Sequence, residues 1–382
     1  MNIYQRHFVF RFFIIMLTFL LSPLFFWIFW FSSKRRSKIS PLSKEMRVLV
    51  IPQLTRIGDI VSSTPVFRAI KINYPSAFLS VLVSRKAAGI LRHNKRIDSL
   101  IIFEDFSFWG LIKFIRREKF DVGFSLSGTS LSSILFFWAF VPVRVKTLRS
   151  PRPLTEIFTD WLATSLYFFK EGDYLPRHHL KLLSEIGISK AEVVSEVFTP
   201  DYAEKKVGSF LENSHVDLKR PLVGISITAG NRIKEWGDSK FAEVADYIVK
   251  EKNGTVIFLG SPSDKGRIDS LLVNRDKLNF LKATEFTLEE LPALIKRLSL
   301  YIAVDTGPIY IAQALKIPLI DIIGPVEPHE QPPSDSISIQ VSPIGVPPCS
   351  FVFREAMDKE NAKRAVLSIS KEQVIFAINK LL

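Results

Sequence analysis

The sequence contains almost no cysteine. Cys349 is the one cysteine among 382 residues, so an internal disulfide framework and a multi-cysteine metal site are both excluded. A single thiol also fits a reducing compartment. Acidic residues are in short supply too, since 38 acids accompany 51 lysines and arginines, for a formal net charge of +13. This balance favours anionic partners such as phosphates, a membrane surface or nucleic acid.

Two motifs that are missing from the sequence exclude further classes of protein. A dinucleotide-dependent oxidoreductase needs G-x-G-x-x-G after a strand, and "RIGDIVSS" at Arg56–Ser63 lacks it. Aromatic residues lie mainly in apolar runs and not between basic residues, so we expect no nucleic-acid partner. His178 and His179 are adjacent and cannot share one helix face, so we expect no metal site there.

Charge is absent from Phe12–Phe31, "FFIIMLTFLLSPLFFWIFWF". About twenty apolar residues span a bilayer as a helix, and the segment predicts an N-terminal transmembrane helix. A cleaved signal peptide is the weaker alternative, because no small-residue cleavage site follows. The basic run "SKRRSK" comes next and places the body on the cytoplasmic side of the inner membrane. A segment that lies in the membrane interface is the other alternative.

The rest of the chain alternates between strand-like and helix-like segments, and this predicts an α/β fold with two parallel sheets. Hydrophobic residues make up 47% of the sequence, enough for a large core. We expect an anchor and linker at 1–45, an N-terminal domain at 46–205 and a C-terminal domain at 206–382. The closing helix could pack back on the N-terminal domain. Expected strands are 47–51, 78–83, 99–103, 121–125, 222–227, 255–259, 300–304 and 319–323; expected helices include 59–71, 108–118, 154–169, 239–250, 308–315 and 371–382.

The first strand leads into "IPQLTRIGDI", which carries Asp59 beside Gly58. Asp59 could be a helix N-cap, its carboxylate accepting from backbone N–H groups. Alternatively it is a base in an active site, because ligands bind at the carboxyl ends of parallel strands. The sequence around Asp59 alone leaves both interpretations open.

The segment "AVDTGPIYIAQAL" also follows a strand and opens a helix. Thr306 can cap this helix, Gly307 permits a tight turn and Pro308 suits the first helical turn. The free N–H groups there favour a phosphate, and Asp305 could orient the loop or bind a sugar hydroxyl. An ordinary strand-to-helix turn would explain the same residues.

Two more strand ends carry polar residues. "ITAGNRIKEWGDSKF" allows close backbone approach around Thr228 and brings positive charge with Lys234, which could stabilise a departing diphosphate; a solvated basic loop is the alternative. "FLGSPSD" ends in Asp264, which could hold ribose hydroxyls.

Together these segments resemble one family. "RIGDIVSSTPVFRAIKINYPSAFLSVLV", "TAGNRIKEWGDSKFAEVADYI", "FLGSPSD" and "DTGPIYIAQALKIPLIDIIGP" follow the order found in glycosyltransferase family 9, the bacterial ADP-heptose:lipopolysaccharide heptosyltransferases. The resemblance covers roughly Arg47–Leu382. It implies a GT-B fold, in which two Rossmann-like domains face each other across a cleft, with the acceptor on the N-terminal domain and the nucleotide-sugar on the other.

The resemblance also implies roles for residues. The family's base aspartate, in its GD motif, falls on Asp59 after Gly58, and its phosphate-binding lysine falls on Lys234. Its nucleotide-binding Asp-Thr-Gly falls on the residues 305–307, with Thr228 in the same donor site. An acidic contact to the nucleoside sugar falls on Asp264. Transfer is expected to invert the sugar, without bound metal or cofactor, from ADP-heptose to an anionic glycolipid.

The chain departs from the family pattern at Tyr310, where members commonly have histidine and where a donor contact is expected. The usual "DLQG" reads "SLSG" at Ser125–Gly128. Two alternatives therefore stay open: a transferase of the same fold that uses a UDP- or dTDP-sugar, and a membrane-tethered protein that binds nucleotide or lipid without turnover.

Overall fold

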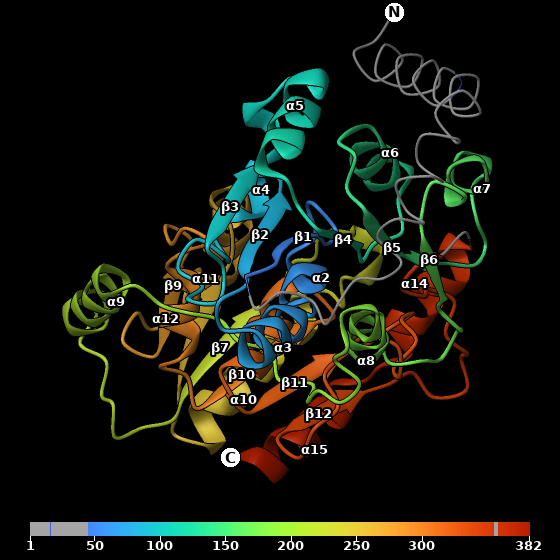
Figure 1. Ribbon diagram of the computed structural model, residues 1–382. Coiled ribbons are helices and arrows are strands. Elements are labelled where there is room, and N and C mark those ends of the chain that lie inside the picture. Colours follow the sequence, from blue (N-terminus) through green and yellow to red (C-terminus); the bar gives the residue numbers. More distant parts are fainter. Residues whose placement is uncertain (1–15, 17–44, 355–357) are drawn as a thin grey trace, which may run out of the picture.

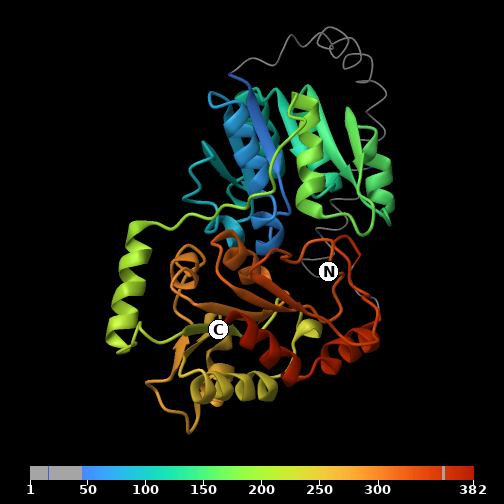
Figure 2. The same cartoon turned by 90° about the horizontal axis from the view of Figure 1, so that it is seen from below.

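The computed structural model describes Met16, residues 45–354 and residues 358–382. The described residues form two domains, each built on a six-stranded sheet whose paired strands all run parallel. The two domains lie against each other (Figures 1 and 2), and the irregular segment 188–200 runs from one to the other. The prediction of an α/β fold with two parallel sheets is confirmed.

The N-terminal domain begins with the apolar strand β1, which is buried along nearly its whole length because helices cover both faces of the sheet. Its strands are β1 (Arg47–Ile51), β2 (Phe78–Val83), β3 (Ser99–Ile102), β4 (Val122–Ser125), β5 (Val143–Leu148) and β6 (Ser165–Phe168). Its helices are α2 (Ile57–Val61), α3 (Thr64–Asn73), α4 (Arg85–Ala88), α5 (Phe108–Glu118), α6 (Ser130–Trp138), α7 (Leu154–Asp160) and α8 (Leu175–Lys181), with 3-10 turns η1 (Phe103–Asp105) and η2 (Leu182–Ile186).

The C-terminal domain repeats this plan. Its strands are β7 (Leu222–Ser226), β8 (Thr255–Leu259), β9 (Phe280–Ala283), β10 (Leu300–Val304), β11 (Leu319–Ile322) and β12 (Ser338–Val341). Its helices are α9 (Asp201–Asn213), α10 (Asp238–Glu251), α11 (Lys265–Leu272), α12 (Leu291–Ile295), α13 (Gly307–Ala314), α14 (Lys359–Ser368) and α15 (Lys371–Leu381), with 3-10 turns η3 (Arg232–Lys234) and η4 (Pro262–Asp264).

Both sheets share one strand order. The first reads β3-β2-β1-β4-β5-β6, and the second reads β9-β8-β7-β10-β11-β12 when its edge at β9 is taken first. In each sheet the order reverses between the first and fourth strands of the domain, and ligands of open α/β sheets bind at this point. The loops after β1, β7 and β10 all end there, so the topology brings the segments with Asp59, Lys234 and Asp305 to the two switch points.

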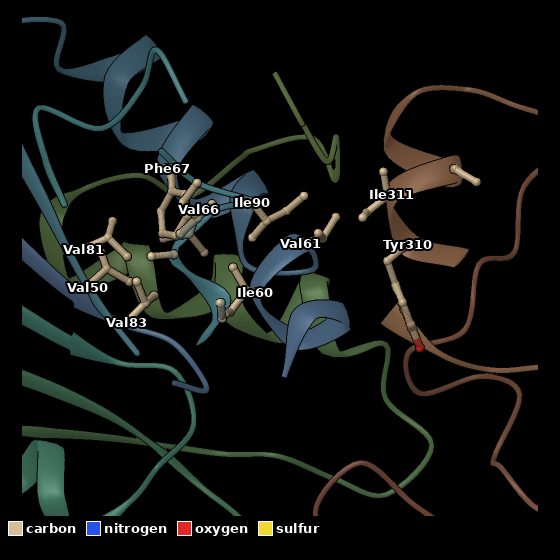
Figure 3. Packing of buried hydrophobic residues seen from close by; sticks show 14 of the residues in the cluster. Val50, Ile60, Val61, Val66, Phe67, Val81, Val83, Ile90, Tyr310 and Ile311 are labelled. Atoms are coloured by element: carbon tan, nitrogen blue, oxygen red, sulfur yellow. The ribbon is translucent and has the colours of Figure 1, made fainter. Parts of the chain in front are cut away.

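A continuous core joins the domains. One cluster of buried side chains includes Ile60 and Val61 of α2 together with Tyr310 and Ile311 of α13. Figure 3 shows Val61 next to Ile311 across the boundary, whereas Ile60 points toward Val50 and Val83 in the N-terminal core. The cleft is therefore closed at its base by packed apolar side chains.

Three expectations about helices were wrong. The helix expected at 59–71 is two helices, because Pro65 in the first turn of α3 cannot continue α2. The helix expected at 154–169 ends at Asp160, and β6 follows; exposure alternates along this edge strand, as expected for period-two packing. The closing helix α15 does not pack on the N-terminal domain: Val374 and Ile378 lie in the C-terminal core, against α10 and β11.

Four strands were not expected: β5, β6, β9 and β12. The polar stretch 201–220 contains α9, which packs on α12, as Figure 1 also shows. No helix within residues 45–354 and 358–382 is long and apolar enough to cross a membrane. The expected transmembrane helix at 12–31 lies outside the described residues apart from Met16, so it stays a prediction.

Candidate active site

Asp59 is the third residue of α2 and does not cap that helix. The N-cap position is Arg56, and its side chain makes no capping hydrogen bond. The Asp59 carboxylate instead accepts a hydrogen bond from Gln331, with 2.8 Å between Gln331 Nε2 and Asp59 Oδ1. Gln331 belongs to the C-terminal domain, in the loop between β11 and β12. The capping alternative is therefore excluded, and Asp59 faces the other domain.

Burial raises the pKa of the Asp59 carboxyl above its ordinary value of 3.8. The positive charge of Arg56, the hydrogen bond from Gln331 and the charge of Lys234 act in the opposite direction, while Asp305 raises the pKa further. Lys234 and Asp305 thus lie close enough to Asp59 to influence its charge. A carboxylate of raised pKa is a stronger base as long as it stays ionised.

Lys234 and Asp305 form an ion pair across two loops of the C-terminal domain. Lys234 closes the turn η3, after Asn231 caps it, and its Nζ lies 2.6 Å from Asp305 Oδ2. The second carboxylate oxygen, Oδ1, accepts a hydrogen bond of 2.8 Å from the Tyr310 hydroxyl. Asp305 is only 6% exposed, so both of its oxygens are held by specific donors in a nearly dry site.

Two glycines let α2 and α13 meet end to end. A Cβ on Gly58 would lie 2.8 Å from the Tyr310 ring, and a Cβ on Gly307 would lie 2.8 Å from Ile57 Cβ. Real Cβ atoms do not approach other atoms this closely, so glycine is required at both positions for the helices to touch. Figure 3 shows Tyr310 at the domain boundary, beside Ile311, which lies across from Val61 of α2.

A cavity of about 240 Å³ opens beside Asp59. It is lined mainly by the N-terminal domain, including Arg56, Arg149 and His179, and is closed on one side by Phe353 from the C-terminal part of the chain. Burial lowers the pKa of His179 to about 3, so its imidazole is neutral near pH 7. The cavity therefore offers arginine charge and a base to a ligand on the N-terminal side of the cleft.

Comparison with known proteins decides the family. The model of glycosyltransferase family 9 (heptosyltransferase) matches residues 108–350, which is more than half of the chain. The chain belongs to glycosyltransferase family 9. It is therefore a glycosyltransferase, as the resemblance of the sequence motifs implied. The matched range contains Lys234 and Asp305 but not Asp59, whose assignment depends on the geometry above.

Individual family members agree with this result. Lipopolysaccharide heptosyltransferase 3 from Escherichia coli is 28% identical over 282 residues, which cover 70% of this chain and 80% of that protein. The crystal structure of a family 9 transferase from Veillonella parvula superposes with a TM-score of 0.75 at 21% identity, covering 90% of this chain and 98% of the other. That of E. coli ADP-heptose lps heptosyltransferase II gives 0.70 at 18% identity, covering 88% and 98%. The two structures show that the fold is shared along nearly the whole described chain.

The structure brings most of the predicted site of this family 9 transferase together. Gly58 packs on the ring of Tyr310, whose hydroxyl donates to Asp305, and Asp305 pairs with Lys234; the carboxylate of the adjacent Asp59 accepts from Gln331. Thr306 is the N-cap residue of α13, and Gly307 is its first residue, although the Thr306 side chain makes no capping bond. Thr228 is half-buried just beyond β7, at the same carboxyl edge of the sheet.

Asp264 has a different local function from the one expected. Its Oδ2 accepts hydrogen bonds from the backbone N and the hydroxyl of Ser261, at 2.8 and 2.6 Å, and so caps η4. A ribose contact would have to use the other oxygen, Oδ1, or displace this cap. The contact between Asp264 and a nucleoside sugar stays a prediction.

Sequence reasoning missed Gln331 and Asp321. Nothing in "PHEQPP" marks Gln331 as a site residue. Asp321 lies within β11 and is fully buried, and its two carboxylate oxygens make no hydrogen bond to the described residues. Burial, and then the negative charge of Asp305, raise its pKa well above 3.8, which favours the neutral acid. An aspartate inside the apolar run "PLIDII" is a signal that could have found it.

Proposed function

We propose that this protein transfers a heptose from ADP-heptose to a glycolipid of the lipopolysaccharide-core type, with inversion at the anomeric carbon. The observation that carries the proposal is that Asp59 faces the other domain, bonded to Gln331 and next to Gly58, which packs on the Tyr310 ring that is bonded to the Lys234–Asp305 pair. The family supports sugar transfer, and the two relatives from E. coli named above are lipopolysaccharide heptosyltransferases. The inverting course and the identity of the nucleotide are expectations from the family resemblance.

In this mechanism the acceptor hydroxyl binds in the cavity beside Asp59. Asp59 accepts its proton as the oxygen attacks the anomeric carbon from the face opposite the nucleotide, an assistance worth about 10²–10⁴-fold. The departing diphosphate gains negative charge. Lys234 and the free N–H groups of the first turn of α13 would stabilise it, since helix N-termini favour anions. The proposal assigns this neutralisation to the chain's own residues, without a resident metal or cofactor.

The cavity supports an anionic acceptor. Arg56 and Arg149 both line it, and Arg149 is held in place by Glu156 through Nε, at 2.8 Å from Oε2. Arginine guanidinium groups bind carboxylate and phosphate groups, and Arg149 could do so only through its remaining Nη1, because its Nε and Nη2 both donate to Glu156. A glycolipid whose sugars carry such groups fits this lining better than a neutral one.

We also propose that residues 12–31 attach the protein to the inner membrane, with the two domains on the cytoplasmic side. The support is the sequence alone: an uncharged apolar run followed by four basic residues between 34 and 38. Membrane fractionation followed by protease treatment of right-side-out spheroplasts tests it. Digestion of the two domains in intact spheroplasts would overturn the cytoplasmic placement.

The central experiment offers purified protein ADP-, UDP-, GDP- and dTDP-sugars and records thermal stability and turnover. We expect ADP-heptose to raise the melting temperature and to be consumed in the presence of a lipopolysaccharide-core acceptor. Asp59→Asn should keep the thermal shift and lose most turnover, while Lys234→Ala should lose the shift. Asp201→Asn and Lys250→Ala, which change exposed side chains, are matched controls.

Other outcomes decide between the alternatives. If only UDP- or dTDP-sugars raised the melting temperature, the protein would still be a transferase, but its donor would be one of these sugars and not ADP-heptose. A shift with ADP but no turnover with any acceptor would support a binding protein. Normal turnover of Asp59→Asn would remove Asp59 from the mechanism.

A further inference from the structure

Helix α7 carries its apolar face outward. Leu154, Ile157, Phe158 and Trp161 follow the spacing i, i+3, i+4 and i+7, which places them on one face of a helix. In a soluble protein such a face normally packs on the core. Here the four side chains are 71%, 45%, 45% and 39% exposed. The helix is therefore inverted relative to the usual pattern.

The inward face of α7 is polar, and specific ion pairs hold it there. Glu156 and Asp160 are 4% and 7% exposed. Glu156 pairs with Arg149, and Asp160 lies 2.7 Å from the Nζ of Lys146, which is itself buried in β5. Turning the apolar face inward would break both pairs and leave charges buried without partners, which is strongly destabilising. The outward orientation is thus fixed by the fold.

The apolar face continues beyond α7. Leu166 and Phe168 of β6 and Trp109 of α5 are also exposed large hydrophobic residues. Aromatic contacts join α7 and α5 to the intervening α6, since the rings of Trp161 and Phe137 lie 6.1 Å apart and those of Trp109 and Trp138 lie 6.3 Å apart. Figure 1 shows α5, α6, α7 and β6 following one another along one side of the N-terminal domain. We call Trp109, Leu154, Ile157, Phe158, Trp161, Leu166 and Phe168 the aromatic face.

The charged residues around the aromatic face indicate what kind of partner could bind it. Residues 106–170 contain nine lysines and arginines and four acids. When the buried Arg144 and the pairs Lys146–Asp160 and Arg149–Glu156 are set aside, six basic residues and two acids remain. Lys113, Arg116 and Lys170 are exposed on the flanking α5 and just after β6. Tryptophan and phenylalanine next to lysine and arginine are the composition of surfaces that bind the interface of an anionic membrane.

We propose that the aromatic face docks on the surface of a lipid bilayer that contains anionic lipids. The inference deepens the proposed function and rests on it in one respect: the cavity beside Asp59 would then open next to the membrane that holds a glycolipid acceptor. Arg149 makes the connection, because it lines the cavity and also pairs with Glu156 of α7. The uncharged run at 12–31 is independent support from the sequence for a membrane location.

The test uses the full chain, because residues 12–31 could bind vesicles without any help from α7. A spin label is placed at Phe158→Cys or at the control Ile344→Cys, each in a Cys349→Ser background. Ile344 is 75% exposed and lies in the C-terminal domain. The vesicles are phosphatidylcholine with or without phosphatidylglycerol.

In anionic vesicles we expect the label at 158 to become accessible to oxygen and protected from a water-soluble nickel chelate, whereas the label at 344 stays accessible to the chelate. Three results would overturn the proposal. The label at 158 could remain in water while the protein sediments with vesicles, or the protein could fail to sediment. The label at 158 could also be protected from the chelate in the absence of vesicles. That result would indicate that a second copy of the chain, or residues 1–44, cover the aromatic face.

A second measurement removes the face itself. In the triple variant Leu154→Gln, Ile157→Gln, Phe158→Gln, a spin label at Leu166→Cys should lose the protection from the nickel chelate that it has in anionic vesicles when the face is intact; unchanged protection would contradict the proposal, and residues 12–31 do not affect this readout. The melting temperature of the triple variant should not fall, since the three replaced side chains are already exposed. The matched control changes Leu278, Ile344 and Phe376, which are equally exposed in the C-terminal domain. Neither readout uses turnover, so failure of the docking proposal is distinguishable from failure of the proposed function.

Discussion

Gly58→Ala is the most direct test of how closely the two halves of the site are held. The added Cβ would lie 2.8 Å from both Cδ2 and Cε2 of the Tyr310 ring, whereas carbon atoms rest at about 3.5–4.0 Å. The ring cannot swing away, because it is only 5% exposed and its hydroxyl is bonded to Asp305. Helix α2 must therefore move back by about 1 Å, and Asp59 moves with it.

Two effects on stability oppose each other in this variant. Overpacking costs about 1–3 kcal/mol, while alanine in a helix gains about 0.5–1 kcal/mol over glycine. The melting temperature should therefore fall only modestly. Activity should fall much further, because a displacement of about 1 Å in a catalytic group can cost about 10²-fold. We expect kcat/KM with the nucleotide-sugar to drop by about 10–100-fold.

The assay pairs steady-state kinetics with thermal unfolding. Gly266→Ala is the control, since a Cβ there meets nothing within 4 Å. Combining Gly58→Ala with Tyr310→Ala should cost less than the sum of the single changes, because the clash is then gone. Wild-type kinetics for Gly58→Ala would show that α2 and α13 are not in contact in the working enzyme, and the assembly of the site from two domains would be refuted.

Three further outcomes are expected. Gln331→Leu removes a donor that lowers the Asp59 pKa, so the acid limb of kcat/KM against pH should move to higher pH; an unmoved limb would contradict the assignment of Asp59 as base. Tyr310→Phe removes the 2.8 Å bond to Asp305 and should lower the unfolding free energy by about 1–3 kcal/mol and weaken nucleotide binding, as denaturant titration and calorimetry would measure. His179 has a pKa of about 3 when folded against 6.5 as a free side chain, so it favours the folded state above pH 6.5 and less so as the pH falls. Between pH 7 and 5 the loss from this group is about 2 kcal/mol, and His179→Gln should flatten the dependence of melting temperature on pH over that range.

The sequence was sufficient for the elements whose pattern is local. The apolar runs of β1, β2 and β10 and the amphipathic α5 were predicted within a residue or two. The sequence was not sufficient to predict strands that contain buried charged side chains. "VRVKTL" looks like a basic loop, yet it is β5: Arg144 is only 8% exposed and donates to the backbone carbonyls of Leu162 and Val141 at 2.6 and 2.7 Å, and Lys146 finds Asp160. The partners that make such burial tolerable lie elsewhere in the chain and are invisible to a local pattern.

The residues of the site also fall into those that the sequence could identify and those that it could not. Asp59, Lys234 and Asp305 could be found because each follows a strand, and parallel strands end at one edge. Gln331 could not, because it lies in an irregular loop and reaches Asp59 across 272 positions of sequence. The inversion of α7 was hidden for a related reason: its apolar spacing predicts a helix correctly, but only the ion pairs of Glu156 and Asp160 decide which face is turned outward.

The charges of the cleft explain why a tyrosine fits at position 310. Lys234 acts on Asp59, Asp305 and Asp321 together, so a diphosphate bound at α13 would compete with Asp305 for this one ammonium. If Lys234 turned toward the phosphate, the Asp305 carboxylate would lose that donor. It would then keep a hydrogen bond only if the side chain at position 310 stayed protonated and continued to donate. Burial raises the pKa of Tyr310 well above 10, so its hydroxyl donates at any working pH. Histidine, which the family resemblance leads us to expect at this position, could donate as well, but it could also take up a proton and bring positive charge. Tyrosine adds no charge, so in the proposed mechanism the leaving group would depend on Lys234 and the start of α13 for positive charge.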